Sequence, residues 1–166
     1  MKKLMLGLMI LGSISAFANG RGQVASKDHV GEKTATVQMI AYSTGGLKLD
    51  ATNSMLNFGN LKAYNGEAKS TAIKVSEDSI PDGQQSNITI VTEGNAELKN
   101  ENGTDKLNVA ISFDKNGNAT NKNVILTSVK PLESVDIYGK IDKSTANSAP
   151  VGQYKGQFTV TAYYNL

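Results

Sequence analysis

The chain has 166 residues, no cysteine, 17 basic and 15 acidic residues, and a formal net charge of +2. The scattered and nearly balanced charges exclude a surface built to bind nucleic acid, and the lack of cysteine excludes disulfides. The length suits one domain with a real core, which sheet hydrogen bonds and apolar burial must hold together.

The first 18 residues have the pattern of a secretory signal peptide. Lys2 and Lys3 precede an apolar run, and a small-x-small cleavage site ends at Ala18. The run is shorter than the roughly 20 residues that a membrane-spanning helix needs. We therefore expect cleavage and export. Loss of Lys2 and Lys3 leaves fifteen basic and fifteen acidic residues, so the formal charge falls to zero.

The rest of the chain predicts short strands. Apolar and polar residues alternate in many segments, as in strands whose successive side chains face opposite sides of a sheet. We expect a flexible leader at 19–33 and no helix. The expected strands are residues 34–42, 47–51, 54–61, 72–75, 87–92, 107–113, 124–129, 134–138 and 158–164. This spacing predicts an all-β, antiparallel sandwich, with a domain at 43–166 that follows a leader and strand at 19–42.

The sequence offers no catalytic, cofactor-binding or metal site, and we expect no enzymatic activity and no cofactor. The only histidine, His29, lies in the leader, where no rigid frame can hold a catalytic triad. Residues 114–118 begin like a calcium loop, but Ile125 occupies the position of the required bidentate acid. The pair Asn116 and Gly117 instead predicts a hairpin turn.

The C-terminal segment resembles the last strand of chaperone–usher pilins. Those subunits carry a glycine and a near-final tyrosine at the spacing of Gly152 and Tyr164. The glycines and tyrosine of the sequence Gly152-Gln-Tyr154-Lys-Gly156 also resemble the tail of colonization-factor subunits, which form the alpha, or class 5, fimbriae.

Two further segments support the same resemblance. Residues 32–37 are similar to the N-terminal extension of the colonization-factor subunits. The run Leu56-Asn-Phe58-Gly59 resembles a motif near the first body strand of spore-coat-U-like pilins. The resemblance therefore touches both ends of the chain and one internal motif.

The resemblance implies an immunoglobulin-like sandwich that lacks one strand and is completed by donor-strand exchange. A periplasmic chaperone caps the groove first, and an outer-membrane usher exchanges the chaperone strand for the N-terminal strand of the next subunit. Residues 34–42 are the expected donor strand, with side chains that enter successive pockets: Ala35, Val37, Met39 and Ala41. The expected acceptor-groove strand contributes Gly152, Tyr154, Phe158, Val160, Ala162 and Tyr164.

The expected function is that of a structural subunit of a bacterial surface fimbria. It would polymerise head to tail with other copies or other pilin subunits, pass through the periplasm to the cell surface, and support adhesion. Three alternatives stay open. Residues 34–42 pair within their own chain as the first strand of a complete sandwich. Residues 158–164 are an ordinary central strand with no role in polymerisation. The protein is a monomeric secreted module that binds a glycan or a host protein.

Overall fold

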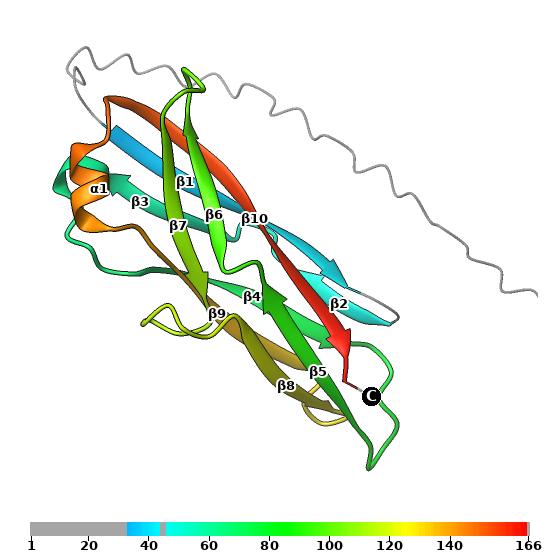
Figure 1. Cartoon of the computed structure of the whole chain (residues 1–166). Coiled ribbons are helices and arrows are strands. Elements are labelled where there is room, and N and C mark those ends of the chain that lie inside the picture. The colour runs from blue at the N-terminus through cyan, green and yellow to red at the C-terminus, as the bar shows by residue number, and fades with distance from the viewer. Residues whose placement is uncertain (1–32, 44–45, 166) are drawn as a thin grey trace, which may run out of the picture.

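The computed structural model describes residues 33–43 and 46–165, which form an elongated body of strands (Figure 1). A short helix, α1 (Lys143–Ser148), lies at one end, together with a 3-10 turn, η1 (Leu61–Ala63). The strands of the described residues are β1 (Lys33–Ser43), β2 (Leu47–Asp50), β3 (Met55–Asn60), β4 (Lys69–Glu77), β5 (Gln85–Thr92), β6 (Asn95–Asn100), β7 (Lys106–Ser112), β8 (Asn121–Thr127), β9 (Leu132–Lys140) and β10 (Gly152–Tyr164).

Strand β10 is the one around which the sheet is arranged. Along one edge it pairs with β1, and along the other edge it pairs first with β6 and then with β5. The hydrogen-bonded order is β2-β4-β9-β7-β6-β10-β1-β3, and β8 is attached through β5. Its two end strands, β2 and β3, follow one another in the chain, and the Ser54 hydroxyl beside β3 donates to the Ala72 carbonyl of β4. The sheet therefore curls around one core.

The core is built mainly from aliphatic residues at alternating strand positions. In β7, for example, Leu107, Val109 and Ile111 are buried while Lys106 and Asn108 are exposed. The largest fully buried side chains are Tyr154, Phe158, Leu56, Leu61, Ile73, Ile88, Ile90, Leu98, Ile111, Leu126, Ile137 and Ile141. The all-β architecture predicted from the alternation is confirmed.

Among the described strands, the pairs are antiparallel with one exception, the pair of β1 and β10, which is parallel. No hairpin connects these two strands, so turn geometry does not set their relative direction. Strand β6 lies in a segment where no strand was expected. Its inward positions are Ala96, Leu98 and Asn100, and a small and a polar residue at two of these three positions weaken the apolar alternation.

Two local predictions are wrong. The first is that no helix forms, because α1 occupies part of the expected loop after β9. Asp142 caps this helix by accepting a hydrogen bond from the Thr145 backbone N–H at 2.9 Å, and a single capped turn is too short to show a helical period. The second is the hairpin at Asn116 and Gly117. The flanking strands do not pair with each other, because β7 pairs with β6 and β9 while β8 pairs with β5. The loop therefore connects two separate parts of the sheet instead of closing a hairpin.

Candidate functional site

The place that β1 occupies between β10 and β3 is the candidate site. Its register with β10 runs from Lys33 opposite Gly152 to Ser43 opposite Ala162. On its other edge β1 pairs antiparallel with β3 over part of its length, up to Gln38. The first described strand is thus inserted beside the last one, as Figure 1 shows in blue and red.

The residues predicted to donate lie on the inner face of β1. Ala35 and Val37 are fully buried, Met39 is 5% exposed, and Ala41 is half-buried. Between them, Gln38 is exposed and Thr36 is half-buried, as alternation requires. In the structure these apolar side chains fill the core of their own chain, and their donation to another copy stays a prediction.

The residues predicted to form the acceptor strand lie next to the predicted donor residues. Tyr154, Phe158, Val160 and Ala162 are buried, while Gly152 and Tyr164 are half-buried. The register sets three predicted donor residues opposite three predicted acceptor residues: Ala35 opposite Tyr154, Met39 opposite Phe158, and Ala41 opposite Val160. The structure therefore brings together the two sets of residues that the sequence placed at opposite ends of the chain, and it includes β1 in the sheet of the domain.

The glycines of the C-terminal motif allow close approach of other strands. A Cβ on Gly156 would collide with the Glu97 carbonyl oxygen, where β6 crosses β10. Gly152 has a φ of +148°, and a Cβ there would lie 2.6 Å from Oδ1 of Asn100. Both positions therefore favour glycine. Between them, the Tyr154 hydroxyl donates to the Pro150 carbonyl at 3.2 Å and anchors the start of β10.

The internal motif supplies the other wall of the site. Leu56 and Phe58 of β3 are buried beside β1. Gly59 has a φ of +62° and lies opposite Ala35, where the register shifts, as in a β-bulge formed around a left-handed glycine. The resemblance in the sequence assigns this motif no role in the groove. The signal for that role is the alternation itself, which places Ser54, Leu56 and Phe58 on one buried face.

Tyr164, at the end of the acceptor strand, has an altered pKa. Burial raises the pKa of Tyr164, and the hydrogen bond and negative charge of Glu77 raise it further. Tyr164 therefore stays neutral at physiological pH and serves as a packing and hydrogen-bonding group rather than a base.

The described residues contain no group of His, Cys, Asp or Glu arranged to hold a metal. The loop that resembles a calcium site uses its acid internally: Asp114 accepts hydrogen bonds from the N–H groups of Asn116, Asn118 and Ala119. Burial acts to raise the pKa of Asp114, but these N–H groups outweigh it and lower the pKa. His29 lies outside the described residues. Within the described residues, no helix is long and apolar enough to cross a membrane.

These features define an all-β fold in which the first of the described strands lies beside the last one and completes the sheet. No protein-family model matches the chain, and no curated protein sequence matches it significantly. Among solved structures, the chain is similar to the CooA pilin subunit from enterotoxigenic Escherichia coli, with 11% sequence identity, a TM-score of 0.31, and coverage of 77% of this chain and 90% of that chain. Similarity at this level carries no argument about function.

Proposed function

We propose that this chain is a structural subunit of a bacterial surface fimbria, in which β1 of one copy fills the place between β3 and β10 of the next. The observation that carries the proposal is the position of β1. Among the described strands it is the first, it contributes its inner face to the core, and it is bonded on both edges to strands that come later in the chain.

An empty place between β3 and β10 costs stability, which explains why the groove needs an occupant. Removing β1 takes away the buried side chains of Ala35, Val37 and Met39. Burial of a Val or a Met is worth about 1.5–3 kcal/mol each. Removal also leaves two strand edges unpaired, and such edges recruit strands from other chains. A subunit without a strand in this place therefore binds one from a neighbour.

The direction of β1 adds a second reason for exchange. In its own chain β1 runs parallel to β10, and parallel pairing is slightly less stable per residue than antiparallel pairing. A strand from a neighbour that enters in the opposite direction pairs antiparallel with β10, along which β1 has eleven paired residues, and parallel only with β3, along which β1 has five. It still presents every second side chain to the core. Donation from each copy to the next is a contact that does not close, so it produces a fibre.

The remaining parts of the proposal follow from the sequence resemblance. The signal-peptide pattern of residues 1–18 supports export to the periplasm. A chaperone that supplies a strand to the groove and an usher that exchanges it account for how the subunit avoids early aggregation. In this proposal the fibre lies on the cell surface and supports adhesion, and the protein has no catalytic role.

The test compares three forms of the chain: residues 19–166, residues 33–166 without the leader, and residues 43–166 without β1. Each is refolded at about 10 µM and about 1 mM, because a tethered strand has an effective concentration in the millimolar range. Unboiled and boiled samples are then run on a denaturing gel. We expect the first two forms to give a ladder of bands in unboiled samples, stronger at the higher concentration. Boiling should reduce this ladder to a monomer band. The third form should give no ladder.

The second candidate function is a monomeric secreted binding module, and one observation favours it. The described chain already completes its own sheet with β1. If the two longer forms give a single monomer band at both concentrations and residues 43–166 fail to fold, β1 belongs to its own domain. That outcome refutes the fimbrial proposal and supports the monomeric module.

A further inference from the structure

A second interruption of the sheet lies between β8 and β9, away from the place of β1. The two strands leave a tight turn at which Thr127 and Lys130 exchange backbone hydrogen bonds of 3.1 and 3.0 Å. Beyond that pair they diverge, because β8 pairs with β5 and β9 pairs with β4. Strand β7 reaches β9 only from Tyr138 to Lys140. Among the described strands, the facing edges of β8 and of the first part of β9 thus have no partner.

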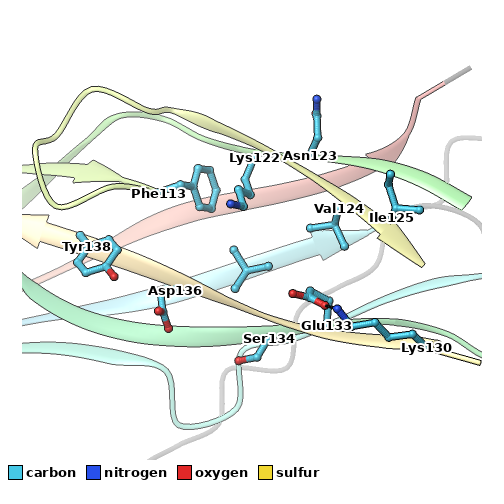
Figure 2. Close-up of a pocket in the computed structure, with 11 residues that line it drawn as sticks. Phe113, Lys122, Asn123, Val124, Ile125, Lys130, Glu133, Ser134, Asp136 and Tyr138 are labelled. Atoms are coloured by element: carbon cyan, nitrogen blue, oxygen red, sulfur yellow. Dashed lines mark ion pairs between the residues drawn. The ribbon is translucent and has the colours of Figure 1, made fainter. Parts of the chain in front are cut away.

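A cavity of about 540 Å³ fills the fork between these two edges (Figure 2). Val124 of β8, Val135 of β9 and Phe113 line it and are buried. Its rim is polar, and Lys130 and Glu133 form an ion pair there. The cavity therefore combines an apolar interior with two rows of unpaired backbone groups, which is the chemistry that an extended peptide satisfies.

Lys122 decides which peptide fits. It lies on the same face of β8 as Val124, and Figure 2 shows its side chain directed toward Phe113. No carboxylate of the described residues forms an ion pair with it. Asp136 also lines the cavity, but it is on the outward face of β9 and its side chain points away from Lys122 in Figure 2. A lysine that faces inward at an open edge disfavours addition of an apolar strand.

We propose that the fork between β8 and β9 binds an extended peptide strand of a partner protein, with an acidic side chain beside Lys122 and an apolar side chain two positions along, against Val124. Residues two apart share one face of a strand, as Lys122 and Val124 do. The acidic side chain neutralises the charge of Lys122. The same lysine therefore disfavours an apolar strand and favours a strand that carries an acidic residue.

The length of the peptide follows from the free edges. β9 lacks a partner on this side from Leu132 to Ile137, and β8 is seven residues long. A strand of about six residues, roughly 20 Å long, therefore spans the fork. The chain runs toward the turn along β8 and away from it along β9, so the added strand is parallel to one and antiparallel to the other. This site is independent of the proposed function, because β1 pairs with β10 and β3.

The experiment uses residues 19–166 and two capped, fluorescein-labelled peptides, Thr-Asp-Thr-Val-Thr-Thr and the same sequence with Lys in place of Asp. Fluorescence anisotropy gives their affinities. We expect the acidic peptide to bind about fivefold more tightly than the basic one, as an exposed ion pair allows. Lys122→Glu reverses this preference. The control, Lys143→Glu in α1, makes the same charge change at the other end of the molecule and keeps the preference of the unaltered protein.

Hydrogen exchange locates the bound peptide. We expect added protection of the amides of β8 and of residues 132–137. Protection of β10 and β3 instead means that the peptide replaced β1, which overturns this proposal and leaves the fimbrial one standing. The proposal is also overturned if the acidic peptide gives no anisotropy change at about 1 mM protein, a weak limit of affinity, or if Lys122→Glu leaves the preference unchanged.

Discussion

Replacing Val37 with Asp tests directly whether β1 is part of the folded core. Val37 is fully buried, opposite Gly156 of β10 and Leu56 of β3, so the substitution places a carboxyl group where no cation is available among its strand partners. Burial raises the pKa of a carboxyl by up to 3–5 units, and each unit corresponds to about 1.4 kcal/mol. At pH 7 we expect Val37→Asp to lower the free energy of unfolding by about 4 kcal/mol or more.

The matched control is Gln38→Asp, which adds the same charge on the exposed face of β1. Urea unfolding followed by circular dichroism gives both free energies of unfolding. The folded-state pKa of the buried carboxyl lies above its unfolded value of roughly 4, so the loss of stability grows as the pH rises above 4 and is relieved as the pH falls toward it. Equal midpoints for Val37→Asp and Gln38→Asp at pH 7 refute the placement of β1 in the core.

The same substitution changes what is expected of the fimbrial subunit. From the sequence alone, Val37→Asp is expected to leave the subunit folded and unable to donate its strand. The structure buries Val37 in its own chain, so a loss of both stability and ladder formation is now the expected result. A variant that forms normal ladders argues against strand donation by β1.

Three further predictions concern the frame around the site. Gly156→Ala is expected to lower the free energy of unfolding by about 1–3 kcal/mol, because the added methyl collides with β6, and urea unfolding measures the change. Asp142→Ala is expected to lower the thermal midpoint. Hydrogen bonds from Ser144 and Thr145 lower the pKa of Asp142 to about 2, so its contribution is present above pH 4 and disappears as the pH falls toward 2; an unaltered pH profile in the variant contradicts this. Asp114→Ala is expected to lower the thermal midpoint at pH 7, because three loop N–H groups lose their acceptor. The control is Lys115→Ala, and an equal decrease in its thermal midpoint contradicts a specific role of the Asp114 carboxylate.

Alternation predicted the faces of the strands well, because the side-chain period does not depend on which strand lies alongside. Phe158, Val160 and Ala162 all face the core, as expected. The same period does not indicate whether a strand runs parallel or antiparallel to its neighbour. Ala35 and Val37 would face the core whether β1 ran parallel or antiparallel to β10, so the parallel pairing was outside the reach of the sequence pattern.

Features that depend on segments from elsewhere in the chain were also out of reach. Gly156 was noted as part of a motif, but the collision that excludes a side chain there comes from Glu97, far away in sequence. Alternation places Lys122 and Val124 on one face, yet only the sheet order reveals that β8 has an unpaired edge beside them. The residues of the candidate groove between β3 and β10 were therefore predictable from the sequence. The fork between β8 and β9 was not.

The position of β1 sets a condition on fibre assembly. A strand joined to its own groove by a short connection has an effective concentration in the millimolar range, whereas a neighbour's strand in dilute solution is at about 1 µM. The own strand is therefore favoured about a thousandfold, or roughly 4 kcal/mol, which antiparallel pairing by the neighbour's strand must offset. An agent that holds the groove before β1 enters it removes this competition. If β1 donates, assembly in dilute solution therefore needs such an agent, and the concentration dependence of the ladder measures how large the competition is.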